Sequence, residues 1–348
     1  MSVSVRYKRW QQTRHRKEMR FRGRIKRGKL KKRKGQTVTS PIIRGERIPP
    51  IVLEAPEHFS LVNNKDETLA FFDKALSRIQ NCKVRQSIFF DLQKITTITP
   101  DAIMYLIAMV KNIKRCRALR TSCQGNMPID PNARACIEKS GFYSFVSSPN
   151  PLPHLELKSA VQISSGSEVD VSLIGSICSF VSAKSGLPER LYTKGLYQII
   201  IELMTNTIQH AYNNTNGIMD NRWYIYAEDS HEKIQFVFLD TGDGIPATIT
   251  INFFEKVAKL FGSNVTDAKL ISSALKGVYR SETGERHRGK GLPNIYDASK
   301  TDRISNLNII SGHGQCTVDE SCAILESSST INFAGTLFCW QFDKTAEV

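Results

Sequence analysis

The chain has 348 residues, 41% of them hydrophobic, and a formal net charge of +15. This length allows two ordinary domains, and the composition excludes a wholly disordered protein. No uncharged apolar run reaches the roughly 18–20 residues that a membrane span needs. A secretory h-region and the serine-rich amphipathic stripe of a transit peptide are also missing. The sequence therefore predicts a cytoplasmic protein without a transmembrane segment.

The excess positive charge is confined to the first 34 residues. This segment holds 16 Lys or Arg residues against one acid, Glu18, and the remainder is balanced at 32 basic and 32 acidic residues. Its apolar residues are too sparse to bury a core, so we expect residues 1–47 to form a disordered basic arm and linker. Aromatic residues within residues 1–34 favour salt-dependent, nonspecific binding to nucleic acid. Docking to a protein partner or to an anionic membrane surface stays open.

Regular patterning begins near Ile51. In chain order, the pattern predicts strands near 51–53 and 59–61, a helix over 66–82, a buried strand over 87–92, and helices over 100–116 and 131–142. Alternating strands and helices are typical of an α/β sandwich, which we place at residues 48–147.

One turn in this region is rich in threonine. The segment SIFFDLQKITTITPDAIMYLIAMV is a buried strand, a Thr-rich turn and a helix, and the unit ends with KSGF. It resembles a STAS domain, the fold of anti-sigma-factor antagonists and sulfate-transporter tails. In the antagonists this turn carries a serine that a partner kinase phosphorylates, whereas this sequence offers Thr96, Thr97 and Thr99. Thr99 is also placed to cap the helix that Pro100 opens, with Asp101 favourable in its first turn.

A polar column marks the second half of the chain. After a Pro- and Ser-rich stretch that predicts a linker over 148–170, we expect helices over 171–185 and 188–212. The second contains IELMTNTIQHAY, in which Glu202, Asn206 and His210 follow at intervals of four residues. Such residues lie on one face of an α-helix, so the polar groups face one place, which predicts a binding site. For His210, a hydrogen bond near the helix end is an equally good explanation.

In two later segments, glycines lie at the end or at the beginning of a strand. In IQFVFLDTGDGIP a buried strand ends at Asp240, and Gly242 and Gly244 let the backbone turn sharply beside a ligand. In INFAGTLFCWQF the last strand is entered through Gly335 and Thr336. Both segments predict strand ends that approach a bound molecule.

A third segment, RHRGKGLPNIYDAS, predicts a phosphate-binding helix start. Gly289 and Gly291 open the helix, so that unpaired amides and the positive end of the helix dipole can face phosphates. Arg288 and Lys290 add positive charge at the same place.

The order of these segments resembles the motif series of the GHKL ATPases, which include gyrase, histidine kinases, heat-shock chaperones of the ninety-kilodalton class and mismatch-repair proteins. IELMTNTIQHAY is similar to the N-box of the anti-sigma-factor serine kinases. The resemblance implies an α/β sandwich over residues 171–348, with helices on one face of a mixed sheet. The predicted fold class is therefore α/β (α+β), a STAS-like unit followed by a GHKL unit.

The resemblance implies ATP and Mg²⁺ as cofactors. Asn206 would bind Mg²⁺, Asp240 would accept a hydrogen bond from the adenine amino group, and Glu202 would act as general base. The remaining nucleotide-binding residues would be His210, Gly242, Gly244, Ile245, Arg288, Gly289, Lys290, Gly291, Leu292 and Thr336. Between the segments IQFVFLDTGDGIP and RHRGKGLPNIYDAS we expect a lid with short helices over 253–262 and 267–277 and a mobile loop at 281–288.

The leading prediction is a Mg-ATP-binding regulator, an ATPase or kinase-like protein whose nucleotide site is coupled to a STAS-like domain. One alternative is a protein-serine/threonine kinase of the anti-sigma-factor type, which modifies its own STAS-like domain or a protein partner of the STAS or sigma-regulator type. Another is a non-catalytic ATP-sensing scaffold that binds nucleic acid through its arm. The resemblance also implies pairing into a homodimer.

Overall fold

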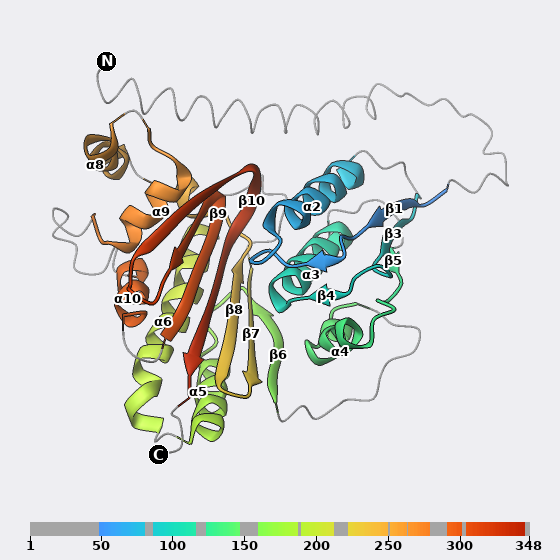
Figure 1. Cartoon of the computed structure of the whole chain (residues 1–348), viewed down its shortest axis with the longest axis horizontal. Helices are drawn as coiled ribbons and strands as arrows, with labels where there is room; N and C mark the ends of the chain where they lie inside the picture. Colours follow the sequence, from blue (N-terminus) through green and yellow to red (C-terminus); the bar gives the residue numbers. More distant parts are fainter. Residues whose placement is uncertain are drawn as a thin grey trace.

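The computed structural model describes residues 49–80, 86–115, 123–146, 159–186, 189–211, 222–249, 251–262, 264–278, 291–300 and 304–344. The basic arm, residues 148–158 of the predicted linker and the predicted mobile loop lie outside these residues. Within them the chain is α+β, with helices and sheets in both halves (Figure 1).

Residues 49–146, the N-terminal unit, contain a parallel sheet with strand order β1-β3-β5 and a separate parallel pair, β2 and β4. The predicted strands and helices of this region are present, and the short β4 and β5 are additions. The elements are β1 (Ile51–Glu54), β2 (His58–Phe59), α2 (Lys65–Gln80), β3 (Ile88–Asp91), β4 (Thr97–Ile98), α3 (Pro100–Arg115), β5 (Cys123–Gly125), α4 (Pro131–Lys139) and the 3₁₀ turn η1 (Phe142–Ser144).

Residues 159–344, the C-terminal unit, form one sheet with strand order β6-β7-β8-β10-β9, which we call the C-terminal sheet. Its elements are β6 (Ala160–Gly166), α5 (Val171–Ser185), α6 (Glu189–Ala211), β7 (Trp223–Ser230), β8 (Lys233–Asp240), α7 (Ile245–Thr248), α8 (Ile251–Phe261), α9 (Asp267–Leu275), α10 (Gly291–Ala298), β9 (Ile304–Val318) and β10 (Ile324–Asp343). None of the helices in the described part of the chain combines the length and the apolar character needed to cross a bilayer.

The C-terminal sheet corrects two predictions. Every pair of neighbouring strands in its described residues is antiparallel, so the expected mixed sheet is wrong. Short connections between β7 and β8 and between β9 and β10 produce this arrangement, because strands joined by a tight turn run antiparallel. The strand β6 also lies inside the predicted linker 148–170. Only Ala160 and Ile163 of this strand are buried, and so weak an apolar pattern does not predict a strand.

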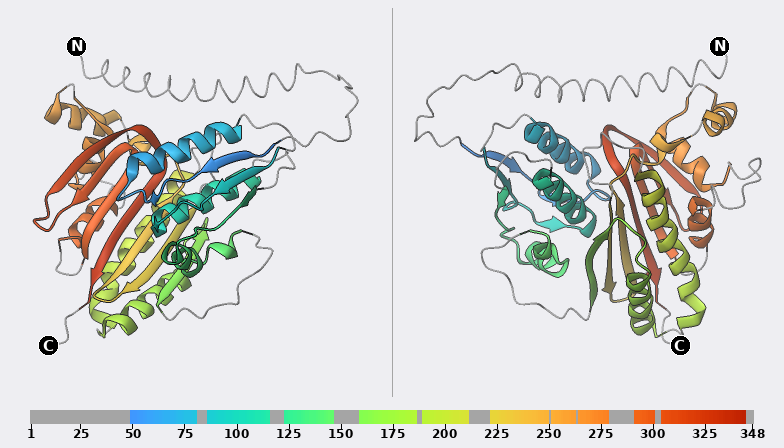
Figure 2. Two further views of the ribbon diagram at one scale, coloured as in Figure 1. Left: turned by 45° about the vertical axis from the view of Figure 1, so that its right-hand side comes forward. Right: turned by 180° about the vertical axis from the view of Figure 1, so that it is seen from behind.

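The two faces of the C-terminal sheet are covered by different layers. Ile234, Phe236 and Phe238 of β8 pack with α5, α6, α9 and α10, in what we call the helix-side core. Val237 and Leu239 alternate with them and pack with the N-terminal unit, in what we call the interface core. Figure 2 shows the sheet standing between these layers.

The helix α3 explains why the N-terminal unit stays attached to the sheet. All residues from Asp101 to Val110 are buried, so this helix is covered on every side. A helix without an exposed face belongs inside a core rather than on a surface. One side of α3 faces the strands of its own unit, and the other reaches the C-terminal sheet, where the Tyr105 and Phe333 rings lie 4.7 Å apart.

Candidate functional site

The predicted polar column lies on α6. Glu202 and Asn206 are half-buried, while the intervening Leu203 and Met204 are buried in the helix-side core. This alternation places both polar side chains together at the margin of the core, one turn apart. The side chain of His210, the third predicted member of the column, lies outside the described residues.

Gly291, the first residue of α10, packs directly on this column. A Cβ atom at Gly291 would lie 3.1 Å from Oε2 of Glu202 and 3.0 Å from Nδ2 of Asn206. Such separations are shorter than most side chains tolerate, so the close approach of the helix start depends on glycine. The start of α10 therefore lies beside a carboxylate and a carboxamide, and the positive end of its helix dipole is near both. In this way the structure places Gly291, from the segment RHRGKGLPNIYDAS, next to the segment IELMTNTIQHAY.

The segments IQFVFLDTGDGIP and INFAGTLFCWQF meet at one end of the C-terminal sheet. Trp223 pairs with Asp240, Asp240 with Thr336, and Thr336 with Ser311, which makes a row across β7, β8, β10 and β9. Two residues further along each strand, Ile225, Phe238, Phe338 and Ile309 belong to the helix-side core. Because strand side chains alternate with a period of two, the row faces the same side of the sheet as α6. We call Asp240, Thr336 and Ser311 the polar row.

Ser311 is a member of the site that the sequence motifs did not reveal. Its buried hydroxyl accepts from the Ile245 backbone N–H at 2.9 Å and donates to the Gly335 carbonyl at 2.9 Å. It also lies 3.2 Å from Oγ1 of Thr336. One side chain thus ties the glycine loop after β8 to the start of the last strand segment. The available signal was a small polar residue directly after two isoleucines in NIISGHG.

The carboxyl group of Asp240 has an unusual environment. Burial at the end of β8 raises its pKa to about 7, because burial disfavours the charged form. A hydrogen bond from the Gly242 backbone N–H, 2.6 Å from Oδ1, acts in the opposite direction. Nearby Asp243 raises the pKa further through like-charge repulsion. This carboxyl group therefore changes its protonation state near neutral pH.

Two glycines beside Asp240 have backbone conformations that other residues rarely adopt. Gly244 has φ of +81°, and a Cβ there would lie 2.8 Å from the Gly335 carbonyl oxygen and from Oγ of Ser311. Gly335 has φ of +110°, and a Cβ there would overlap the carbonyl group of Asp240. Both positions need glycine for conformation and for space.

The predicted site residues therefore fall into two clusters on one side of the C-terminal sheet. Glu202 and Asn206 lie with Gly291, and the polar row lies with Gly242, Gly244 and Ile245. Leu292 is half-buried against the helix-side core. Arg288, Gly289 and Lys290, which were predicted to bind phosphates, lie outside the described residues.

The predicted lid helices differ in how firmly they are held. The helix α9 is capped by Thr266, whose hydroxyl accepts from the Lys269 backbone N–H at 3.2 Å, and Ala268, Ile271 and Leu275 are buried in the helix-side core. By contrast, α8 buries Phe254, Val257 and Ala258 in a small cluster of its own with Leu270. The expectation that both helices belong to a lid is thus not supported for α9, because its apolar face is part of the main core.

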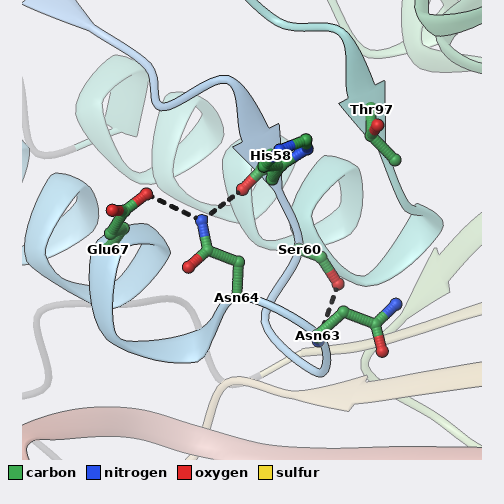
Figure 3. A pocket seen from close by; sticks show the side chains of 6 residues that line it. All are labelled: His58, Ser60, Asn63, Asn64, Glu67 and Thr97. Atoms are coloured by element: carbon green, nitrogen blue, oxygen red, sulfur yellow. Dashed lines mark hydrogen bonds between the residues drawn. The ribbon is translucent and has the colours of Figure 1, made fainter.

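A separate polar pocket lies in the N-terminal unit (Figure 3). It has a volume of about 320 Å³ and is lined by His58, Ser60, Asn63, Asn64, Glu67 and Thr97. Nδ2 of Asn64 donates to the His58 carbonyl at 2.8 Å and to Oε2 of Glu67 at 2.9 Å. This pocket is part of the N-terminal unit, on the opposite side of the C-terminal sheet from α6 and α10 (Figure 1).

The threonine turn beside this pocket contains three threonines, of which Thr96 donates from its hydroxyl to the Glu57 carbonyl at 3.3 Å. Thr96 and Thr97 are exposed. As predicted, α3 begins at Pro100, and the Thr99 carbonyl accepts from the Ile103 backbone N–H at 3.2 Å. The Thr99 hydroxyl donates to the Phe59 carbonyl at 3.5 Å. The neighbouring Asp101 has its pKa raised by burial, and its Oδ2 accepts from the Leu61 backbone N–H at 2.6 Å. Thr99 thus supports the fold of the turn.

Neither a comparison with models of protein families nor one with curated proteins gives a match to this chain.

Proposed function

We propose that the chain binds Mg-ATP on the helix side of the C-terminal sheet and acts as a GHKL-type ATPase or protein kinase with a regulatory role. The observation that carries the proposal is the contact of Gly291 with both Glu202 and Asn206. A glycine-opened helix start, a carboxylate and a carboxamide are the groups that phosphate and magnesium chemistry requires at one place.

The donor set fits the implied cofactors. The side-chain oxygen of Asn206 is a suitable ligand for Mg²⁺, which takes one or two protein ligands together with phosphate oxygens and water. When bound, the ion would neutralise phosphate charge and orient the terminal phosphoryl group. The amides at the start of α10 would face the phosphates, and the polar row would hold the base.

Asp240 is the group in the polar row that best suits recognition of an exocyclic amino group. Its Oδ1 is engaged by the Gly242 backbone N–H, which fixes the carboxyl group and leaves Oδ2 to accept. Only the ionised form presents acceptors alone. Because burial raises the pKa of Asp240 to about 7, binding that needs this acceptor should strengthen as pH rises through neutrality.

Glu202 is the candidate general base. It lies on the same face of α6 as Asn206 and beside the start of α10, so it is next to the place proposed for the phosphates. A carboxylate there can take a proton from an attacking water or hydroxyl group. General-base catalysis of this kind contributes roughly 10²- to 10⁴-fold in rate.

The N-terminal unit is our candidate STAS-like regulatory domain, and its position bears on the identity of the phosphate acceptor. The exposed Thr96 and Thr97 belong to the unit that packs on one face of the C-terminal sheet, whereas Glu202 lies on the other face (Figure 2). A phosphoryl group beside Glu202 is thus separated by the sheet from the threonine turn of the same chain. The arrangement favours water, a partner protein or a second copy of the chain as acceptor.

The test is to incubate purified full-length chain with Mg²⁺ and γ-labelled ATP, alone and with cell lysate. We expect label in inorganic phosphate or on a protein, and the Glu202→Gln variant should bind ATP normally while transfer falls about 10²-fold or more. Glu320→Gln, the same change on an exposed turn between β9 and β10, is the matched control. Absence of ATP binding by the unmodified chain would overturn the proposal.

If the label appears on the chain, a mixing experiment identifies the donor. Glu202→Gln chains, distinguished by a size tag, should become labelled when unmodified chains are added, because transfer runs between molecules. Labelling that occurs only within active chains and does not depend on protein concentration would contradict this geometry.

A further inference from the structure

We propose that Tyr105, in the N-terminal unit, is a positioning residue for the polar row and sets the affinity of the nucleotide site from the opposite face of the sheet. The inference rests on the proposed function, which supplies its ligand, Mg-ATP. Its structural basis is an irregularity in the pairing of β9 with β10.

On the interface side, Tyr105 is held against one short segment of β10. Its ring lies 4.7 Å from the ring of Phe333 and 4.6 Å from that of Phe72. The residue is almost fully buried, and its phenol lies beside the backbone of Ala334. Such close packing fixes the position of this segment, because a close-packed core leaves little room for displacement.

On the helix side, the next two residues of β10 contact the polar row. The Gly335 carbonyl accepts from Ser311 at 2.9 Å, and Thr336 pairs with Asp240 and approaches Ser311. Gly335 also packs so tightly on the backbone of Asp240 that no Cβ could be accommodated. A displacement of this segment must therefore move the carboxyl end of β8 or its partners.

A bulge joins the two sets of contacts. Phe333 pairs with Gly312, and Thr336 pairs with the adjacent Ser311, so Ala334 and Gly335 are extra residues in β10. Bulges re-aim side chains and are common beside functional sites. Here Ala334 lies beside Tyr105 of the N-terminal unit, and the Gly335 carbonyl accepts from Ser311 of the polar row. The bulge is thus the shortest covalent link between Tyr105 and the proposed base-binding site.

Another contact between the units offers a matched control at the far end of the sheet. The Lys139 ammonium of α4 forms an ion pair with Glu228 of β7, which also accepts from the Tyr226 hydroxyl at 2.9 Å. Glu228 pairs with Gln235, whereas the neighbour of Asp240 on β7 is Trp223, five residues earlier. Five residues of strand correspond to about 17 Å, so this contact lies well away from the polar row.

The experiment compares Tyr105→Phe with Lys139→Gln in the full-length chain. Tyr105→Phe removes only the hydroxyl group that lies beside the backbone of Ala334, and we expect the Kd for Mg-ATP to rise about threefold or more. Lys139→Gln weakens the same interface elsewhere and should leave Kd within twofold. An unchanged Kd in Tyr105→Phe, or an equal rise in both variants, would overturn the inference. Phe333→Leu replaces Tyr105→Phe if the latter does not fold.

A second readout needs no nucleotide. The titration of the Asp240 carboxyl, followed by ¹³C NMR, should shift in Tyr105→Phe and stay unchanged in Lys139→Gln. If the unmodified chain binds no Mg-ATP, the proposed function is wrong, and this titration alone decides the coupling. An unchanged Asp240 titration in Tyr105→Phe would then refute the coupling.

Discussion

The two faces of the C-terminal sheet are built from the same strands but have different chemistry. In β8, Val237 and Leu239 belong to the interface core, whereas Phe236, Phe238 and Asp240 face the helix side. The interface face is closed by aromatic and aliphatic side chains of the N-terminal unit. The helix side is apolar along most of its length and becomes polar at the end that holds Asp240, Thr336 and Ser311.

This difference separates the residues that hold the molecule together from those proposed to bind nucleotide. Alternation along a strand lets adjacent residues serve the two purposes independently. The bulge at Ala334 and Gly335 is the place where this independence is lost, because one segment contacts both layers. Variants at the bulge, on the polar row and on the interface face should therefore behave differently.

The largest expected effect is at the bulge. Gly335→Ala forces a side chain into φ of +110° and against the carbonyl of Asp240, so we expect the free energy of unfolding to fall by about 3 kcal/mol or more. Gly175→Ala is the control, because Gly175 lies inside α5 with open space around its Cβ position. That variant should be stabilised by roughly 0.5–1 kcal/mol. Denaturant titration measures both, and equal stability of the two variants would contradict the tight packing at Gly335.

The next largest effect concerns binding. Asp240→Asn replaces one acceptor oxygen by a donor while leaving an oxygen that can still accept from Gly242, so the fold should be retained. We expect Mg-ATP affinity to fall about a hundredfold, because a site built to pair with an amino group is left mismatched. Calorimetric titration at pH 8 measures the loss. Affinity within threefold of the unmodified chain would remove Asp240 from the proposed base-binding site.

The same variant gives a pH test of the Asp240 environment. The folded-state pKa of about 7 exceeds the unfolded value near 3.8, so Asp240 stabilises the fold at low pH and this contribution is lost as pH rises through 7. The unmodified chain should therefore lose stability relative to Asp240→Asn between pH 5 and pH 8. The relative loss over this window is on the order of 3 kcal/mol, since about two pH units lie between pH 5 and the folded-state pKa and one unit corresponds to about 1.4 kcal/mol. Thermal unfolding at both pH values checks the sign.

Much of the architecture could be predicted from apolar periodicity. The helix α5 occupies the predicted residues, and α3 and α8 differ from prediction by one or two residues at an end. The shared face of Glu202 and Asn206 was also predicted, because residues at an interval of four share a helix face whatever the tertiary fold. The position of Gly291 beside them follows from the tertiary fold.

The features that the sequence did not predict depend on contacts between segments far apart in the chain. The strand β6 was missed because its burial comes from pairing with β7 rather than from its own pattern. Ser311 was missed because its role depends on the register that places it beside Thr336, and register is not written in a single strand. The sheet direction was wrong for a related reason, since the motif order did not specify how the strands were connected.

The smallest effect should come from the interface face. Tyr226 is buried in the interface core, and burial together with the adjacent carboxylate of Glu228 raises its pKa well above the usual value. Tyr226→Phe removes the hydrogen bond to Glu228 but keeps the ring and the ion pair with Lys139, so unfolding should become easier by about 1 kcal/mol. Mg-ATP affinity should stay within twofold, because Tyr226 faces away from α6 and pairs with Val237, three residues before Asp240. A large loss of affinity here would show that the two faces are coupled along the whole sheet, and would remove the special role of the bulge.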